Sequence, residues 1–221
     1  MTIAARPAPG ASWREWVATA LELAGKARCE RFFGRLAYLP LTGDGLWQVR
    51  QGVVQLTVTQ ASGDEVLVGL AGPGMPVGLP LTGLPTHQAQ ALTDVYAVWL
   101  TLADLERSGT LAQALLFPLM RRLRQTEHLL VITAGQRRVQ ERLRHLLLLL
   151  MQEVGQPVEQ GVRLEVRLTH QSLANAIGTS RVTCTRLLGR FQDWGWITWG
   201  PDRHLVILPA MPRTGDGRIE G

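Results

Sequence analysis

The sequence predicts an α+β protein in which an antiparallel β-roll is followed by a long helix and a winged helix-turn-helix. Three observations support this prediction. Short β-rich runs separated by glycine turns occupy the first half of the chain. Leucines at three- and four-residue spacing follow them, and a helix-turn-helix pattern lies near the end. The chain has 221 residues, of which 46% are hydrophobic, which is sufficient for two packed domains.

We expect four segments along the chain. Residues 1–108 would hold an N-terminal helix and the roll, and 109–134 would form a dimerisation helix. Residues 135–211 would form the winged helix-turn-helix, followed by a disordered tail at 212–221. The N-terminal helix is expected at residues 13–26, where the apolar side chains have amphipathic spacing.

The roll is predicted from strand runs that alternate with turn residues between residues 36 and 100. Residues 53–60 and 66–70 flank a Ser-Gly-Asp turn, which is typical of a β-hairpin. Many short strands with regular glycine turns indicate an antiparallel sandwich or barrel.

A long helix is predicted after a short one at residues 101–107. Leucines recur at helical spacing from Leu111 to about Thr133, and Gly135 then ends the pattern. Pro118 predicts a kink or a looser first half. The apolar side of this helix could pack on the roll or pair with a second copy of itself. We favour the pairing for a helix of this length.

The C-terminal segment has the order of elements of a winged helix. Residues 136–154 predict a helix, 155–161 a turn, and 162–168 a half-buried strand with alternating apolar and charged residues. After the helix-turn-helix, strands at 196–199 and 204–208 would form the wing around Gly-Pro-Asp.

The helix-turn-helix itself is predicted at residues 168–190. Gly178 would form the turn, because glycine adopts a positive φ that a side chain resists. Ala174 would let the second helix approach closely. The inner-face residues would be Leu173, Ala174 and Ile177 on the first helix and Cys184, Leu187 and Leu188 on the second.

The outward residues of the second helix are hydroxyls, guanidinium groups and one small apolar group. These residue types contact phosphates, guanines and thymine methyl groups. The chain has a net charge of +5, and its only lysine is Lys26, so arginine supplies nearly all the positive charge. Arginine suits planar recognition of phosphate and guanine. The motif taken alone also fits an ordinary helical hairpin with a basic surface.

Several other classes of protein are disfavoured. Cys29 and Cys184 form neither a disulfide framework nor a zinc motif. The first residues lack the apolar core of a signal peptide, and the longest apolar run, 146–151, is too short to span a bilayer. We therefore expect a cytoplasmic protein with no membrane partner.

No cofactor or metal is expected. An iron–sulfur cluster needs about four cysteines, and haem ligation through Cys29, His87 or His128 stays only a formal alternative. A cupin-type enzyme would need clustered histidine and carboxylate ligands. The roll has one histidine and acids without that spacing, so we expect no enzyme and no catalytic residues.

The order of roll, long helix, hinge and winged helix-turn-helix resembles the CRP/FNR family of bacterial transcription regulators, from about residue 36 to 208. Residues 168–189, with Ser-Arg-Val-Thr-X-Thr-Arg-Leu-Leu-Gly, and 124–130 are most similar to the nitrogen-control branch of that family. The resemblance implies a jelly roll of the cyclic-nucleotide-binding type. It also implies a homodimer that places two recognition helices in successive major grooves of a palindromic double-stranded DNA site.

The resemblance assigns base contacts to the second helix. Arg181 and Arg186 would each donate two hydrogen bonds to a guanine. Val182 stands where many family members have a glutamate, and it would pack on a thymine methyl group, which predicts a GTA-type half-site. Thr169 and Thr179 are also good N-cap residues. Phosphate contacts are expected from Thr169, His170, Gln171, Ser180, Thr183, Thr185 and Arg190.

The effector is the least defined part. Residues 74–94 lack the arginine, glutamate and serine with which relatives hold cyclic AMP, so a cyclic-nucleotide site is not expected. The nitrogen-control branch binds 2-oxoglutarate, but its second arginine is replaced here by Pro85 or Thr86. The remaining effector contacts that the resemblance implies are Val77, Gly78, Leu79, Arg122 and Glu127. Two alternatives stay open. The chain could be a regulator gated by 2-oxoglutarate, or a module that binds a protein partner at the apolar roll.

Overall fold

The computed structural model describes residues 30–209, which divide into two compact units at residues 131 and 132. The helix predicted at 13–26 and the tail predicted at 212–221 lie outside the described residues. Each unit is described by itself.

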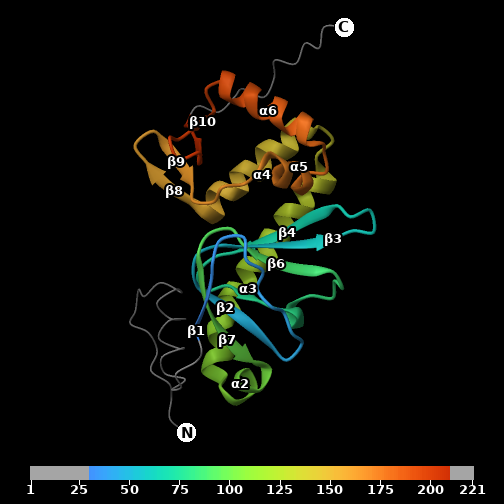
Figure 1. The fold of residues 1–221 in the computed structure, drawn as a ribbon, viewed down its shortest axis with the longest axis vertical. Coiled ribbons are helices and arrows are strands. Elements are labelled where there is room, and N and C mark those ends of the chain that lie inside the picture. The colour runs from blue at the N-terminus through green and yellow to red at the C-terminus, as the bar shows by residue number, and fades with distance from the viewer. Residues whose placement is uncertain (1–29, 210–221) are drawn as a thin grey trace. The chain divides into compact units, whose positions relative to one another are not determined.

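The first unit is a roll of two antiparallel sheets, followed by two helices (Figure 1). The four-stranded sheet has the order β1-β7-β2-β5 and the three-stranded sheet the order β4-β3-β6. Their bounds are β1 Glu30–Phe33, β2 Gly45–Gln51, β3 Val54–Thr59, β4 Glu65–Ala71, β5 Pro76–Val77, β6 His87–Ala91 and β7 Val95–Thr101, with a 3-10 turn, η1, at Leu79–Leu81. The predicted hairpin is confirmed as β3 and β4, which pair from Val54↔Ala71 to Thr59↔Glu65.

The core of the roll lies between the two sheets. Trp47 packs edge-on against Phe33 and Trp99, at centroid distances of 5.1 and 4.9 Å. Its indole N–H donates to the carbonyl of Pro40 at 2.7 Å, so the polar end of a buried aromatic ring is satisfied. Alternate apolar residues of β2, β3 and β6 complete this core.

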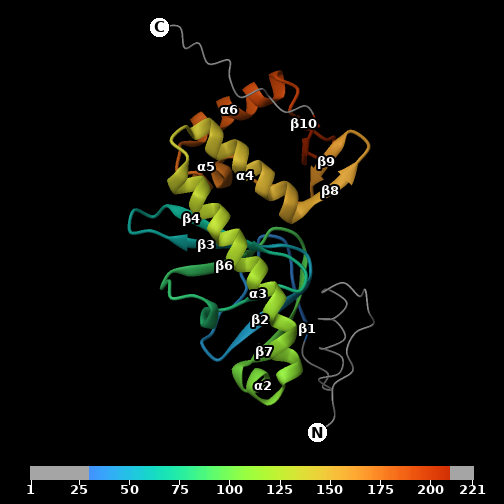
Figure 2. The ribbon, with the colours of Figure 1, turned by 180° about the vertical axis from the view of Figure 1, so that it is seen from behind.

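The helices of the first unit are α2, Leu102–Arg107, and α3, Gly109–Leu130. Asp104 and Thr101 form a capping box at the start of α2, and Ser108 caps α3. Pro118 is buried inside α3 and does not end it. Figure 2 shows α3 lying along the roll. A π-helical turn, η2 at Val131–Gly135, follows, so helical structure ends at Gly135 as predicted.

The second unit joins three helices to a four-stranded antiparallel sheet of order β10-β11-β9-β8. Its elements are α4 Val139–Val154, β8 Gly155–Val158, β9 Gly161–Leu164, α5 His170–Ala176, α6 Arg181–Asp193, β10 Ile197–Trp199 and β11 Leu205–Ile207. Leucines of α4 and an edge-on pair of Phe191 and Trp196, 4.9 Å apart, form its core.

Two predictions about this sheet were wrong. Residues 155–161 contain β8 and not only a turn, because their backbone pairs with β9 from Gly155↔Leu164 to Val158↔Gly161. Pro157 is tolerated there because β8 is an edge strand. The strand predicted at 162–168 ends at Leu164, although Val166 beyond it is still buried.

Within residues 30–209, no helix has both the length and the apolar character needed to cross a membrane.

Candidate nucleic-acid interface

A tight turn at Gly178 joins α5 and α6. The φ of Gly178 is +62°, in the left-handed region that favours glycine. The N–H of Gly178 donates to the carbonyl oxygen of Asn175 at 3.3 Å. The N–H of Thr179 donates to the carbonyl oxygen of Ala174 at 3.0 Å. The predicted turn residue is confirmed. The predicted inner-face residues Leu173, Ala174, Ile177, Cys184, Leu187 and Leu188 are all buried.

Both helices begin with a hydroxyl cap. Thr169 accepts a hydrogen bond from the N–H of Ser172 at 3.0 Å, and Ser180 accepts one from the N–H of Thr183 at 3.2 Å. The prediction of Thr169 as an N-cap is confirmed. The prediction of Thr179 is wrong, because the chain stays non-helical for one more residue and Ser180 takes that position.

The outward side of α6 is open. Arg181, Thr185 and Arg186 are exposed, and Val182 is 78% exposed. Val182, Arg186 and Gly189 share one face, because they are three or four residues apart on the helix. No atom lies within 4 Å of the place that a Cβ of Gly189 would take. The predicted base-reading residues therefore occupy a surface that no other described part of the second unit covers.

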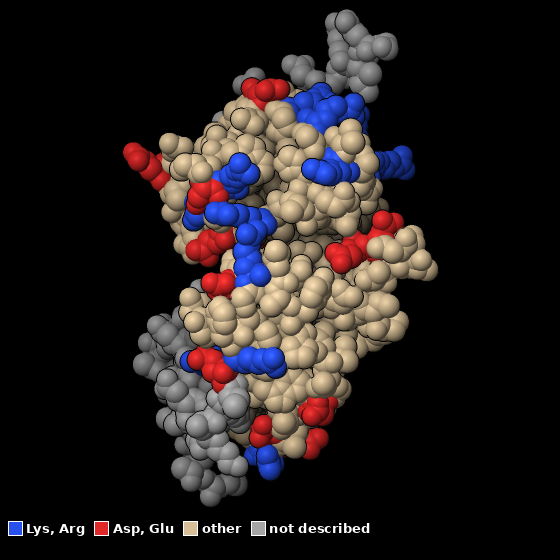
Figure 3. Space-filling view, in the orientation of Figure 1, with Lys and Arg blue, Asp and Glu red and all other residues tan. Residues whose placement is uncertain are grey.

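The fully charged side chains of this surface are all basic. Residues 169–192 contain three arginines and no aspartate or glutamate. Figure 3 shows basic side chains gathered over the α6 end of the second unit. The N-terminus of α6 adds the positive end of its helix dipole. Such a surface attracts a polyanion.

His170 connects three elements of the second unit. Its Nδ1 lies 2.8 Å from the Oγ1 of Thr185 on α6, and its ring lies 5.9 Å from the ring of Trp199 on β10. Two residues predicted as phosphate contacts, His170 and Thr185, therefore bond to each other across the helix-turn-helix. We call His170, Thr185 and Trp199 the His170 bridge.

Two further residues predicted as phosphate contacts also have partners within the protein. Gln171 donates from Nε2 to the Oδ1 of Asn175 at 2.6 Å. The guanidinium of Arg190 stacks on Trp194, 5.4 Å from the ring centroid. These contacts fix the direction of both side chains on the exposed surface.

The wing is held by an ion-pair cluster between β9 and the β10–β11 turn. The Nη2 of Arg163 donates to Asp202 and lies 3.0 Å from the Nδ1 of His204, which is 2.9 Å from Asp202. Burial alone would raise the pKa of Asp202. The hydrogen bonds from Arg163 and from the His204 backbone, with the charges of both residues, lower it instead to about 2. Arg203, between Asp202 and His204, has a positive φ of 59°.

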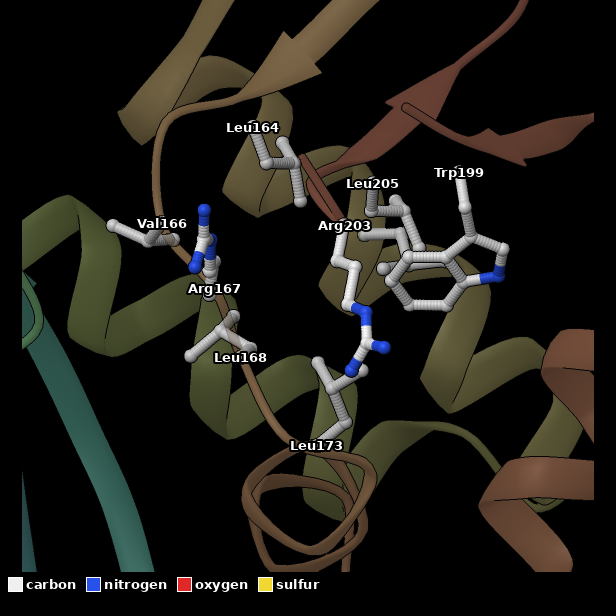
Figure 4. A pocket seen from close by; sticks show the side chains of 9 residues that line it. Leu164, Val166, Arg167, Leu168, Leu173, Trp199, Arg203 and Leu205 are labelled. Atoms are coloured by element: carbon white, nitrogen blue, oxygen red, sulfur yellow. The ribbon is translucent and has the colours of Figure 1, made fainter. Parts of the chain in front are cut away.

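A small, mostly apolar pocket lies where the wing meets α4 and α5. Figure 4 shows the side chain of Arg203 beside Leu173 of α5, and Trp199 beside Leu205 of β11. This pocket marks where the wing packs, and its charged lining residues are Arg167 and Arg203.

Cys184 is buried on the inner side of α6, and this burial raises the pKa of its thiol to about 11. A protonated thiol is a poor nucleophile and a poor metal ligand. Among the described residues, no group of three histidine, cysteine or carboxylate side chains could hold a metal ion.

A second feature lies in the first unit, where α3 packs on the roll. The Oε1 of Gln125 accepts a hydrogen bond from the Leu70 N–H of β4 at 2.7 Å, and Gln125 is 2% exposed. The guanidinium of Arg122 lies over Gly69, where a Cβ would come within 2.5 Å of Nη1. His87 of β6 lies close enough for the charge of Arg122 to act on it.

We call His87, Arg122 and Gln125 the polar cluster. Each has one buried polar atom without a hydrogen-bond partner: Nδ1, Nη1 and Nε2 respectively. Burial lowers the pKa of Arg122 to about 10. Burial and the charge of Arg122 lower the pKa of His87. No sequence pattern indicated that Gln125 and His87 join Arg122, because β6 and α3 are far apart in the chain.

The other residues that the resemblance implied as effector contacts are placed differently. Val77 is buried and pairs with Trp47, and Gly78 lies against Leu46, where a Cβ would come within 2.9 Å. Leu79 begins η1. Glu127 is exposed on α3, away from the side that contacts the roll. Only Arg122 of this set lies in the polar cluster.

The side of α3 away from the roll exposes large apolar residues. Leu116, Leu123 and Leu130 are 55%, 61% and 64% exposed and are separated by seven residues, with Met120 between the first two. We call these four residues the exposed α3 row. Folded proteins rarely leave such a continuous row of apolar side chains uncovered.

The comparisons with known proteins agree with this geometry. A family model described as a Crp-like helix-turn-helix domain matches residues 141–213. Regulatory protein CysR of Synechococcus elongatus is 36% identical over 177 residues, which cover 79% of this chain and 81% of that protein. A global nitrogen regulator of the same organism is 32% identical over 169 residues, which cover 72% of this chain and 76% of that protein.

Solved structures show the same fold. A CRP-family transcriptional regulator from Thermus thermophilus matches with a TM-score of 0.68 at 20% identity, over 80% of this chain and 91% of that one. A CRP/FNR-family regulator from the same organism matches with a TM-score of 0.60 at 27% identity, over 81% and 93%. These relatives are named as regulators and not as enzymes. The chain therefore belongs to the CRP/FNR family of DNA-binding transcription regulators and lies near its nitrogen-control branch.

Proposed function

We propose that the chain acts as a homodimer that binds a palindromic double-stranded DNA site through α6. The observation that supports this most directly is the exposed N-terminal half of α6. It presents arginines and Val182 in a stretch without acidic residues.

The proposed base contacts come from exposed side chains in the first half of α6. Arg181 and Arg186 each donate two hydrogen bonds to guanine, and Val182 packs on a thymine methyl group. Valine cannot accept a hydrogen bond from cytosine, so a GTA half-site is favoured over GTGA. The hydroxyls of Thr169 and Ser180 accept at the caps, and the Ser180 hydroxyl also donates to the Oγ1 of Thr183 at 3.0 Å. These hydroxyls would reach phosphates by turning their O–H from the side-chain partner to the phosphate oxygen. Gln171, Thr183 and Arg190 complete the phosphate contacts, with the pair of His170 and Thr185.

The proposed dimer uses the exposed α3 row. Seven-residue repetition of leucine is the pattern of a coiled-coil seam, and a two-fold axis brings identical rows together. A two-fold protein then requires a palindromic site, with half-sites about one helical turn apart.

The test is binding to a duplex with two GTA half-sites, in competition with the same duplex carrying altered half-sites. For Arg181→Ala and Arg186→Ala we expect about 1–3 kcal/mol less discrimination between the two duplexes, while the dimer persists. Arg35→Ala is the control, because Arg35 is an exposed arginine of the roll. If either α6 variant keeps the preference of the wild type, the assignment of that arginine is refuted.

A second function, gating by a small anion, is favoured by the polar cluster. Three buried polar atoms without partners are costly, and a carboxylate or phosphate oxygen would satisfy them beside the charge of Arg122. These atoms are closed off in the present structure, so binding requires α3 to open locally from β4.

Thermal-shift measurements with 2-oxoglutarate, cyclic AMP and cyclic di-GMP test the second function, because a ligand of the folded state raises the melting temperature. We expect 2-oxoglutarate to stabilise the wild type but not Arg122→Leu, and cyclic AMP to stabilise neither. If 2-oxoglutarate leaves the wild type unchanged, gating by this anion is refuted, and DNA binding through α6 is not affected.

A further inference from the structure

Gly189 lies inside α6, although nothing in the described part of the second unit requires a glycine there. Its φ is not positive, and no atom lies within 4 Å of the place that a Cβ would take. Gly178 and Gly69 differ, because the first has a φ of +62° and the guanidinium of Arg122 lies over the second. Glycine makes a helix less stable than alanine does, because its backbone loses more freedom on folding. The free protein therefore loses stability at Gly189 without a gain in packing or turn geometry.

Gly189 lies on the side of α6 that carries the proposed base contacts. Val182 and Arg186 precede it by seven and three residues, so the three positions share one face of the helix. Seven residues span about 10 Å along a helix, which is close to the width of the major groove, about 12 Å. With Val182 at the base edges, Gly189 would lie at the wall of the groove, where the helix meets the sugar–phosphate backbone of DNA.

The charges near Gly189 define where the DNA strand would cross α6. Arg190 directly follows Gly189, and its guanidinium is held on Trp194, 5.4 Å from the ring centroid. A positive charge therefore lies beside Gly189. Asp193, one helical turn after Gly189, is exposed and would repel a phosphate. The crossing is therefore expected between Arg186 and Asp193, where Gly189 lies.

We propose that Gly189 is a close-approach point, at which the backbone of α6 lies directly against the sugar–phosphate backbone of DNA. This inference rests on the proposed binding of DNA through α6. A residue without a side chain lets a protein backbone come close to its ligand. A Cβ at residue 189 would hold α6 away from the groove wall and lengthen the contacts of Val182 and Arg186 with the bases.

The test compares DNA affinity with stability for Gly189→Ala and Gly189→Leu in the full chain. Fluorescence anisotropy on the duplex with two GTA half-sites gives the Kd, and scanning calorimetry gives the melting temperature. We expect Gly189→Ala to raise the Kd by about tenfold or more, and Gly189→Leu to raise it further. The melting temperature of Gly189→Ala should increase, because alanine favours the helix.

Gly109→Ala is the matched control. Gly109 is exposed at the start of α3, and no atom lies within 4 Å of its would-be Cβ. This control should leave the Kd unchanged. Weaker DNA binding by a more stable variant cannot come from a loss of folding, so the pair of measurements separates a clash with DNA from damage to the protein.

The outcomes separate this inference from DNA binding itself. If the wild type prefers the GTA duplex and both Gly189 variants bind it as tightly, the close approach is overturned while binding through α6 stands. If Gly189→Ala lowers the melting temperature, or if Gly109→Ala weakens binding equally, the lost affinity has another cause and the inference is also overturned. If the wild type does not bind the duplex, the proposed function fails and this inference fails with it.

Discussion

Replacing Gly178 by alanine tests the turn on which the geometry of the helix-turn-helix depends. An alanine Cβ at this position would meet only the Nη1 of Arg142, at 3.6 Å, which is ordinary van der Waals contact. Steric clash with neighbours is therefore not expected. The cost comes from the backbone, because a φ of +62° costs a residue with a side chain about 1–2 kcal/mol. Restricting the unfolded chain returns about 0.4–1 kcal/mol, so the expected net loss of stability is about 1 kcal/mol.

Gly189 provides a matched control, for which the same substitution should change stability in the opposite direction. It lies inside α6, and no atom lies within 4 Å of its would-be Cβ. Gly189→Ala should therefore stabilise the helix by about 0.5–1 kcal/mol. Scanning calorimetry measures both changes, and about 1 kcal/mol corresponds to roughly 4–8 °C for a domain of 60–100 residues. If Gly178→Ala melts at or above the wild type, the reasoning about the turn is refuted.

Three further predictions concern single side chains. Gln125→Ala should destabilise the first unit by about 1–3 kcal/mol in urea titration, because a buried β4 amide loses its acceptor. The control is Gln90→Ala, at a partly buried residue of β6. A loss of stability for Gln125→Ala no greater than that for Gln90→Ala would contradict this prediction. Cys184, whose pKa is raised to about 11, should react with a thiol reagent at pH 8 only when the chain unfolds. A Cys29→Ser background leaves Cys184 as the one thiol to be measured. Rapid labelling of the folded chain would count against a buried, protonated Cys184. Asp202 has a folded pKa lowered to about 2, so its stabilising effect should be present at neutral pH and lost as pH falls toward 2. Asp202→Asn should therefore be less stable than the wild type at pH 7 but equal to it near pH 2. A difference in stability that stays the same from pH 7 to pH 2 would exclude this stabilising role of the Asp202 carboxylate.

The elements that the sequence predicted best are those set by local spacing. The turn at Gly178 and the buried inner face around Cys184 follow from rules that act within about ten residues. The β3–β4 hairpin likewise depends on one turn between two strand runs. The proposed contacts of Arg181 and Val182 with DNA stay predictions, because they depend on a partner whose bases the chain alone does not specify.

The features that the sequence did not predict are both local and distant. β8 contains Pro157 and has no alternating pattern, and it is a strand only because β9 folds back on it. The N-cap of α6 was predicted one residue too early, at Thr179, because both Thr179 and Ser180 suit that position. The polar cluster joins Gln125 to His87, two residues whose neighbours in the sequence show no common signal.

The His170 bridge has a consequence for how the protein meets its target. His170, Thr185 and Trp199 already join α5, α6 and β10 in the free protein, so we expect the proposed DNA-binding elements to keep this arrangement when DNA binds. Less conformational entropy is then lost on binding, and this preorganisation favours affinity without any added contact. It also narrows the range of tolerated sites, since a preorganised surface cannot readjust to a half-site of different shape. A substitution at His170 would therefore be expected to broaden the set of bound sequences before it abolished binding.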